Sequence, residues 1–381
     1  MHPKTPDFKV RVRIVCGEPV HQWILGKFAL RLEHYLKESG VDVDIDYEPD
    51  PAADVNHYII YIQYKGVETP GITTSMITHI DNSAKLNMLK DQLKKVDMGI
   101  CMSGDTRNFL IKNGLPANRL SYISPAHDEV IKPRKRVIGI TCRVQDDGRK
   151  REHLLKDISN VIDSDLFSFK IMGDGWEKYV DLLRSRGFDV EYHNAFIYEL
   201  YTTLIPSFDY YLYMGMDEGQ MGCIDALAAG VECIVTRQGY HLDMLDGIRY
   251  TFVTKEELLG VFEEIQAELK KKIDTVKFWT WPYYAQKHLE MWEYLVAQSK
   301  GENAQVIDRG YSDGVLSITD KIEEGDTAAL DKMRSGAALK ANYVAHTYHS
   351  KKKQFASWIK TKGIAGTVKH IWEKSIEKIF K

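Results

Sequence analysis

Apolar residues recur at two different spacings along the first third of the chain. Short apolar or alternating runs predict β-strands at 10–15, 41–47, 58–62, 75–80 and 98–102. Between these runs, apolar residues four positions apart, such as Phe28, Leu32 and Leu36, predict helices over 23–36, 84–95 and 103–113. Strands that alternate with helices of this length indicate βαβ units, in which helices cover a mostly parallel sheet.

A second series of the same kind follows the charged connector at 132–136. Strands are predicted at 137–141, 167–172, 190–192, 210–214 and 233–236, and helices at 153–162, 178–186, 200–204 and 222–229. Doubly wound sheets bind ligands where strand ends meet helix N-termini. We therefore expect two α/β domains, at 1–133 and 134–278, with the active site in a cleft between them.

The last part of the chain has a different pattern. Strong helix patterns at 256–272 and 283–298 flank an aromatic turn, and residues 301–327 are polar and irregular, as is typical of a linker. Beyond it, residues 351–381 carry nine Lys and two Glu, a local charge of +7. Because the whole chain has a net charge of −3, the first 350 residues have a net charge of −10. Apolar residues recur among these lysines at roughly helical spacing, and basic amphipathic helices with Trp are typical of anionic membrane interfaces. The alternative is that this tail packs against the acidic body, within one chain or in a homodimer.

The composition excludes several classes of protein. Of 381 residues, 44% are hydrophobic and 28% charged, which argues against a disordered chain, a fibre or a multi-span membrane protein. The net charge of −3 provides no global basic field for nucleic acid. Five scattered Cys without metal-ligand spacing predict reduced thiols. Because the N-terminus also lacks the apolar core of a signal peptide, we expect a cytoplasmic enzyme.

The most informative segment is 217–230, DEGQMGCIDALAAG, which links a predicted strand to an Ala- and Leu-rich helix. Gly219 and Gly222 would let the backbone approach a ligand closely, and the free amides at the helix start favour an anion. Asp217 and Asp225 are eight positions apart, so one can face a ligand from the loop and the other from the helix. Without further context, two acidic residues at this spacing more often belong to a solvated helix start. Here Arg143 and Lys150 precede them in the sequence, which favours a binding site.

This segment resembles the signature of retaining GT-B glycosyltransferases, especially family 4, in which two acidic residues are separated by seven others. Both acids are Asp here rather than Glu. The resemblance continues in VIGITCRVQDDGRKREHLL at 137–155, FKIMGDGW at 169–176, CIVTRQG at 233–239 and WTWPYYAQKHLEMWEYL at 279–295. It implies two Rossmann-like domains facing a cleft. Residues 279–300 would return to the N-terminal domain, and 301–381 would form a linker and a basic helical extension.

The resemblance also implies an activity: transfer of a sugar from a nucleotide-sugar donor to a glycan or lipid-linked acceptor, with retention and without a metal or other cofactor. Arg143 and Lys150 would hold the donor diphosphate and stabilise the departing nucleotide. Asp217 would hold sugar hydroxyls, and Asp225 would accept hydrogen bonds from the donor ribose. The remaining expected donor-binding residues are Gly17, Gly173, Asp174, Glu218, Gly219, Gln220, Met221 and Gly222.

Other readings stay open at this point. A GT-B epimerase or phosphorylase is one alternative, and the two substituted acids keep a catalytically silent scaffold as another. His79, at the end of a predicted strand, could position the donor phosphate or the acceptor hydroxyl, although a lone His is more often a structural hydrogen-bonder. Asp163-Ser164-Asp165 resembles the metal-binding motif of the other large glycosyltransferase fold, but its place after a helix favours a turn.

Overall fold

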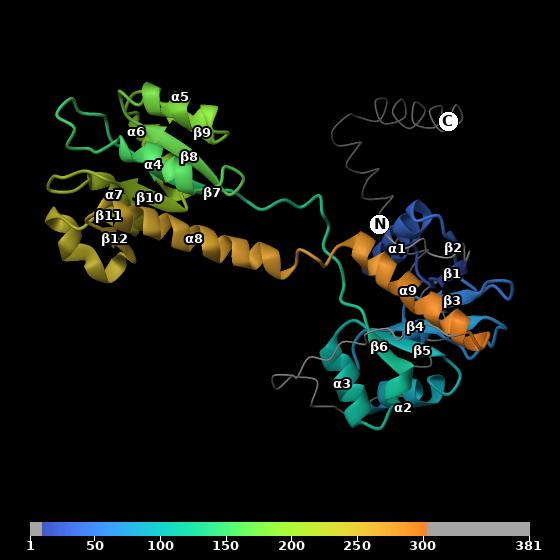
Figure 1. Cartoon of the computed structure of the whole chain (residues 1–381). Coiled ribbons are helices and arrows are strands. Elements are labelled where there is room, and N and C mark those ends of the chain that lie inside the picture. Colours follow the sequence, from blue (N-terminus) through green and yellow to red (C-terminus); the bar gives the residue numbers. More distant parts are fainter. Residues whose placement is uncertain (1–9, 303–381) are drawn as a thin grey trace, which may run out of the picture. The chain divides into compact units, whose positions relative to one another are not determined.

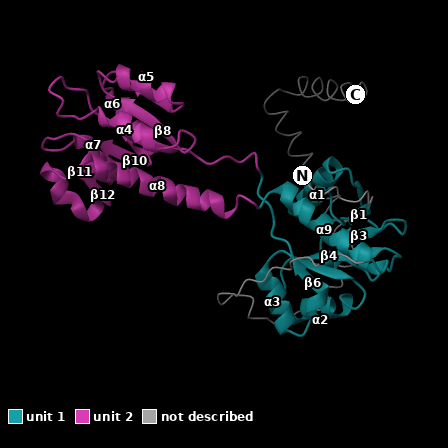
Figure 2. Cartoon of the chain, viewed as in Figure 1, with its two compact units in different colours: residues 1–128, 279–381 teal, residues 129–278 magenta. Residues whose placement is uncertain are grey.

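The chain divides into two compact units, each with its own parallel sheet (Figures 1 and 2). The structure, a computed structural model, describes residues 10–302. Unit 1 comprises residues 1–128 together with 279–381, and unit 2 comprises residues 129–278. The sequence pattern placed the first boundary at 133, five residues later. The linker and basic tail expected beyond residue 302 lie outside the described residues.

The sheet of unit 1 has the strand order β2-β1-β3-β4-β5-β6, with every neighbouring pair parallel. Its strands are β1 (Arg11–Val15), β2 (Asp42–Asp46), β3 (Val55–Tyr58), β4 (Ile72–Ile77), β5 (Met98–Cys101) and β6 (Leu120–Tyr122). The chain first adds β2 on one side of β1 and then β3 on the other. The topological switch point therefore lies between β1 and β3, where doubly wound sheets form a crevice at their carboxyl ends.

Helices cover both faces of this sheet. One apolar cluster joins the sheet to α1 (Ile24–Glu38) and α9 (Trp281–Ser299), and another joins it to α2 (Ser83–Gln92) and α3 (Gly104–Lys112). All six residues of β4 are buried because helices pack on both sides of that strand. Side chains at the helix starts satisfy free backbone amides: Asn82 caps α2 and Ser103 caps α3.

Helix α9 closes the core of unit 1, although it follows unit 2 in the sequence. The ring of Trp281 lies edge-on to Phe28 of α1, with centroids 5.2 Å apart. The indole Nε1 of Trp292 donates a hydrogen bond of 3.1 Å to Thr74 Oγ1 on β4. Trp281 and Trp292 are fully buried, so a large apolar area ties this late helix to the early sheet.

Unit 2 has the strand order β12-β11-β10-β7-β8-β9, and all its neighbouring strands are parallel. The strands are β7 (Arg136–Ile140), β8 (Phe167–Met172), β9 (Asp189–His193), β10 (Tyr210–Tyr213), β11 (Glu232–Thr236) and β12 (Tyr250–Phe252). Helices α4 (Leu154–Val161), α5 (Glu177–Ser185) and α8 (Lys255–Thr275) pack on one face, and α6 (Tyr198–Leu204) and α7 (Met221–Ala228) on the other. The switch point lies between β7 and β10.

These strand orders confirm the prediction of two doubly wound α/β domains. Some element bounds were predicted wrongly. The strand expected at 58–62 is β3, Val55–Tyr58, because Asn56 and His57 are fully buried polar residues that interrupt the apolar pattern. The three-residue strands β6 and β12 were missed, since so few positions carry no readable period. Within residues 10–302, no helix combines the length and apolarity needed to cross a bilayer.

Candidate functional site

The strongest candidate site lies at the carboxyl ends of β7 and β10, at the switch point of unit 2. A cavity of about 410 Å³ opens there. Its lining comes from the segments that follow β7, β8 and β9 and from the start of α7: Thr141, Cys142, Arg143, Gln145, Arg149, Lys150, Met172, Gly173, Asp174, Ala195, Phe196 and Gln220. Three of these side chains are cationic, and one is acidic, so the cavity suits an anionic ligand.

Lys150 and Asp217 form an ion pair across the switch point. The buried ammonium of Lys150 lies 2.8 Å from Asp217 Oδ2 and donates a second hydrogen bond of 2.6 Å to the Tyr213 hydroxyl. The same hydroxyl donates to Asp217 Oδ1 at 2.5 Å, and the amide of Gly219 donates to that oxygen at 3.3 Å. Both carboxylate oxygens of Asp217 are therefore occupied by the chain itself.

The pKa values follow from this network. Burial alone would raise the pKa of Asp217, but hydrogen bonds from Lys150 and Tyr213 lower it on balance, so the carboxylate is ionised at neutral pH. The pKa of the Tyr213 phenol is raised, first by burial and then by its bond to Asp217, so the phenol stays a hydrogen-bond donor. A fixed carboxylate and phenol hold the ammonium of Lys150 in one position beside the cavity.

The two arginines of the cavity are differently placed. Arg149 is exposed and lies 3.4 Å from Asp147 and 4.0 Å from Asp217. Arg143 is also exposed, and among the described residues it has no hydrogen-bond or ion-pair partner. An unpaired guanidinium at the mouth of a cavity is available for bidentate contact with a phosphate or carboxylate.

The loop before α7 depends on its glycines. Gly219 has φ +118, a conformation that L side chains rarely adopt, and a Cβ there would lie 2.7 Å from the Tyr240 ring. The side chain of Gln220 donates to the Thr141 carbonyl at 2.9 Å and fastens the helix start to β7. The amide of Gln220 donates to His241 Nε2 at 3.3 Å. Two other predicted residues, Glu218 and Met221, are exposed on either side of this turn.

Asp225, the second acid of the predicted pair, is hydrogen-bonded to a neighbouring helix of unit 2. It lies on the exposed side of α7, and its Oδ2 accepts a short hydrogen bond from the Tyr201 hydroxyl of α6. The Tyr201 ring in turn packs against Phe196, with centroids 5.2 Å apart. Among the described residues that line the cavity, Phe196 is present but Asp225 and Tyr201 are not.

Gly173 and Asp174 line the cavity from the turn after β8. Gly173 has φ +146, and a Cβ on it would lie 2.1 Å from the Cys142 carbonyl oxygen, so this turn packs directly on the segment after β7. The carbonyl of Asp174 accepts a hydrogen bond of 2.9 Å from the amide of Val144, while its side chain is exposed. This turn, whose Gly173 and Asp174 are among the expected donor-binding residues, therefore forms part of the cavity wall.

Gly17 and His79 belong to unit 1, whereas the other predicted site residues belong to unit 2. The amide of Gly17 donates to Gln63 Oε1 at 2.9 Å, which links the segments after β1 and β3 at the switch point of unit 1. Beside it, burial raises the pKa of Glu18. His79 is exposed, and its Nε2 lies 3.2 Å from the ammonium of Lys85.

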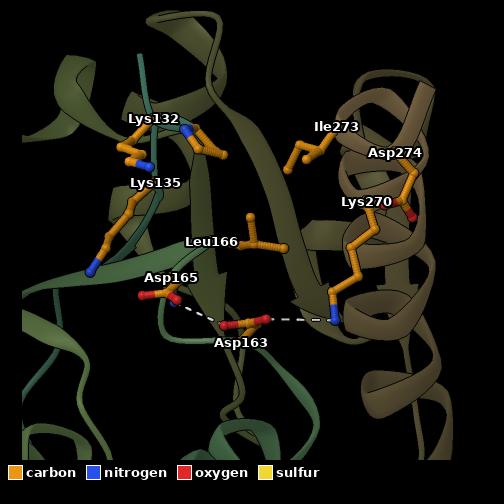
Figure 3. A pocket seen from close by; sticks show the side chains of 9 residues that line it. Lys132, Lys135, Asp163, Asp165, Leu166, Lys270, Ile273 and Asp274 are labelled. Atoms are coloured by element: carbon orange, nitrogen blue, oxygen red, sulfur yellow. Dashed lines mark hydrogen bonds and ion pairs between the residues drawn. The ribbon is translucent and has the colours of Figure 1, made fainter. Parts of the chain in front are cut away.

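A larger cavity of about 640 Å³ lies at the opposite, amino ends of β7 and β8, and three lysines and three aspartates line it (Figure 3). Asp163 Oδ1 accepts the amide of Asp165 at 3.0 Å, and its Oδ2 lies 3.6 Å from Lys270 (Figure 3). Residues 163–165 therefore form a turn that is held by a hydrogen bond within the turn itself. In residues 10–302, no group of three or more His, Cys, Asp or Glu side chains is arranged to hold a metal ion.

Sequence reasoning missed Tyr213, His241, Phe196 and Tyr201. Tyr213 reads as an ordinary apolar strand residue, because the motif gives no sign that its hydroxyl faces Lys150, which is 63 positions away. His241 is buried, and its Nδ1 donates to the Thr236 carbonyl at 2.9 Å, which leaves Nε2 to accept from Gln220. Only Phe196 offered a signal, as an aromatic residue shortly after a strand end.

No protein-family model matches the chain, and the comparison with curated proteins gives no match. Among solved structures, the chain is similar to Anabaena HepE in complex with UDP and glucose, with 12% identity, 77% of this chain and 98% of that one covered, and a TM-score of 0.28. Sucrose-phosphate synthase from Thermosynechococcus elongatus matches with 11% identity, 76% and 100% coverage and a TM-score of 0.33. WaaG, a glycosyltransferase involved in lipopolysaccharide biosynthesis, matches with 14% identity, 76% and 100% coverage and a TM-score of 0.30.

Proposed function

We propose that this protein is a glycosyltransferase that takes its sugar from a nucleotide-sugar donor. The observation that carries the proposal is the pair of cations at the unit 2 switch point: unpaired Arg143 at the cavity mouth, and Lys150 held by Asp217 2.8 Å away. The amide end of α7 begins beside the same cavity and adds a partial positive charge. Together these groups suit a diphosphate.

In this proposal, breaking the bond between the sugar and the diphosphate is assisted by Arg143 and Lys150. Negative charge grows on the departing phosphate oxygen, and two positioned cations stabilise it more in the transition state than in the ground state. Asp217 and Tyr213 orient the Lys150 ammonium. Because the chain supplies these charges, we propose a reaction that requires no metal ion, and from the resemblance of 217–230 we propose retention at the anomeric carbon.

In this proposal, unit 1 would bind the acceptor. Its switch point carries Gly17, Gln63 and the half-buried Glu18, a polar group of the kind that hydroxyl-rich ligands require. We include His79 as a candidate for positioning the acceptor or the donor phosphate. The proposed acceptor class, a glycan or a lipid-linked acceptor, rests on the basic tail in the sequence.

Thermal-shift and turnover assays test the proposal together. The full chain is screened against UDP, GDP, ADP, CMP and dTDP and the corresponding sugar nucleotides, with and without EDTA. A ligand at a hundred times its dissociation constant stabilises the fold by about 2.7 kcal/mol, or a few degrees. We expect one nucleotide to raise the melting temperature by the same amount with and without EDTA. We expect the corresponding sugar nucleotide to be consumed when an acceptor is present. NMR of the product then shows whether the anomeric configuration of the donor is retained.

The alternatives give different outcomes. A silent scaffold binds the nucleotide and never consumes the donor. An epimerase alters the sugar without releasing it to an acceptor, and a phosphorylase requires phosphate. If no nucleotide shifts the melting temperature and no donor is consumed, the glycosyltransferase proposal is wrong.

A further inference from the structure

His241 is a fully buried histidine beside the loop that precedes α7. It belongs to the 3₁₀ segment η4 (Gly239–Gly247), which follows β11. Its Nδ1 lies 2.9 Å from the carbonyl oxygen of Thr236, and its Nε2 lies 3.3 Å from the backbone nitrogen of Gln220. Gln220 lines the cavity and His241 does not. The imidazole therefore joins the end of β11 to the cavity wall without reaching the cavity itself.

The two partners of the ring determine where its proton lies. A carbonyl oxygen only accepts hydrogen bonds, so Nδ1, which faces the Thr236 carbonyl, carries the hydrogen. A backbone amide only donates, so Nε2, which faces the Gln220 amide, carries a lone pair. This geometry requires a neutral imidazole. A second proton, on Nε2, would bring two N–H groups against each other and break the bond to Gln220.

η4 also holds the loop through its backbone. The amide of Tyr240 donates a hydrogen bond of 3.1 Å to the Glu218 carbonyl, and the Tyr240 ring occupies the space next to Gly219. Residues 218–220 are thus fastened to η4 at both ends, by Tyr240 at one end and by His241 at the other. The bond to His241 is the part of this fastening that depends on a titratable group.

The bond to His241 leaves a defined pair of amides at the start of α7. Among the described residues, the backbone amides of Met221 and Gly222 have no hydrogen-bond partner, whereas the Gln220 amide is taken by the imidazole. Free amides in the first turn of a helix attract an anion. The direction in which Met221 and Gly222 present these amides is set by the residue before them, which His241 holds.

We propose that His241 is a positioning residue of the donor site and makes donor binding sensitive to acid: its neutral ring holds the Gln220 amide and thereby fixes the start of α7 beside the cavity. This inference rests on the proposed function, because it concerns the regulation of the same site. The imidazole touches no ligand and acts through the backbone of Gln220.

The groups around the ring set the direction of the acid effect. The rings of Tyr213 and Tyr240 lie edge-on to it, with centroids 5.6 and 5.4 Å away, and the pKa values of both phenols are raised, so both are neutral. Asp217 is negatively charged and favours the protonated ring, but its oxygens are bonded to Lys150 and Tyr213. Burial outweighs this attraction and lowers the pKa of His241. The neutral ring therefore persists at pH 7, and acid removes it.

Two amide variants separate the two ends of the imidazole. His241→Gln extends an amide to about the position of Nε2, so it still accepts the Gln220 amide. His241→Asn reaches only to about Nδ1, so it still donates to the Thr236 carbonyl but leaves Gln220 without an acceptor. Calorimetry near pH 8 measures the affinity for whichever of UDP, GDP, ADP or dTDP binds best. We expect His241→Gln to bind within about threefold of wild type and His241→Asn to bind about tenfold more weakly. Denaturant unfolding shows that both variants fold.

A pH series distinguishes positioning from a merely structural role. Relative to His241→Gln, wild-type protein should lose up to about tenfold in nucleotide affinity for each pH unit below the titration point of the ring. The phosphates of the ligand also titrate, but they do so alike for every variant, so the comparison isolates the imidazole. His153→Gln is the matched control, because His153 is an exposed histidine of unit 2 outside the cavity. It should keep the wild-type pH profile.

NMR of the wild-type chain with ¹⁵N-labelled histidine gives a readout that needs no functional variant. The His241 signals, assigned by their loss in His241→Gln, should show the neutral Nδ1–H form at pH 7. Nucleotide should shift the titration of this ring to lower pH, because ligand and proton oppose each other and their coupling is reciprocal. A hydrogen on Nε2 at pH 7, or a titration that nucleotide does not move, would overturn the positioning role.

The outcomes separate this inference from the function beneath it. If wild-type protein binds a nucleotide while His241→Gln and His241→Asn lose affinity equally and keep the wild-type pH profile, the positioning role is wrong and the proposed function stands. If His241→Asn binds as tightly as wild type, the positioning role is also wrong. Wild-type protein that binds no nucleotide overturns the proposed function and this inference with it.

Discussion

Gly222 packs directly against Tyr211, so closely that a Cβ on the glycine would lie 2.4 Å from the tyrosine hydroxyl oxygen. Tyr211 is fully buried on β10 and shares a hydrogen bond of 2.9 Å with Thr141 at the end of β7. Gly222, the second residue of α7, therefore packs against the ends of β7 and β10, the two strands that form the switch point. This contact sets how close the amide end of α7 comes to the cavity.

Gly222→Ala should therefore destabilise unit 2 by about 1–3 kcal/mol, because the added methyl must displace α7 from well-packed neighbours. The same shift should weaken nucleotide binding. Gly260→Ala is the control: Gly260 is exposed within α8, and nothing lies within 4 Å of the added methyl. It should stabilise the protein by up to about 1 kcal/mol through helix propensity. Denaturant unfolding measures the change in the free energy of unfolding for both variants. Equal changes in Gly222→Ala and Gly260→Ala would contradict the packing argument.

Arg143→Ala and Lys150→Ala should each lower turnover by about 10²–10³, since each removes a cation that meets charge developing on the leaving phosphate. Lys178→Ala is the control, because Lys178 is an exposed lysine of α5 outside the cavity. Steady-state kinetics with the donor found by screening measure the effect. Either variant within twofold of wild type would exclude that residue from the catalytic role.

Asp217→Asn should also reduce turnover, because it removes the charge that holds the Lys150 ammonium at 2.8 Å. The amide retains one acceptor oxygen, so we expect a smaller loss than for Lys150→Ala, about tenfold to a hundredfold. A variant with full activity would show that Lys150 is positioned without its carboxylate partner.

Acid should destabilise unit 1 through two buried histidines. His57 on β3 and His288 on α9 are fully buried with ring centroids 5.2 Å apart, and their Nε2 atoms have no hydrogen-bond partner among the described residues. Burial lowers the pKa of His288 to about 4, and burial together with the nearby His288 lowers that of His57 well below its ordinary value. Both are therefore neutral in the folded protein near pH 7.

The sign of the pH effect follows from proton binding. Below about pH 6.5 the unfolded chain takes up protons on these rings while the folded chain does not, so stability falls as the pH falls toward 4, by up to about 1.4 kcal/mol per pH unit for each ring. His288→Phe should make the melting temperature less dependent on pH between 7 and 4.5. His34→Phe, at an exposed position on α1, should leave the dependence unchanged. An unaltered slope in His288→Phe would contradict the assignment.

Deletion of residues 351–381 should abolish sedimentation with anionic lipid vesicles and leave activity on a soluble acceptor unchanged. The reason lies in the sequence: nine lysines and two glutamates among apolar residues are attracted to an anionic surface. Sedimentation should also fall with added salt. Vesicle binding that persists after the deletion would show that another part of the chain carries it.

Local pattern was sufficient for much of this protein. The strand at Phe167–Met172 was predicted residue for residue, and the helix that follows Gln220 was predicted within one residue. Such elements depend on neighbours in sequence: alternation, capping residues and glycines act over a few positions. The candidate loop at 217–222 belongs to this group, because its glycines and the helix after it are contiguous.

The relationships that make the site depend on the order of the strands. Lys150 meets Asp217 across 67 positions because β10 pairs with β7 rather than with β9. The contact between Asp225 and the Tyr201 hydroxyl is likewise tertiary, since the rotation of α7 on the sheet sets where the Asp225 side chain points. A single sequence shows which residues have charge and which elements they occupy. Only the packing of strands and helices brings those charges together, because contacts between distant positions arise from burial of the sheet faces and leave no period along the chain.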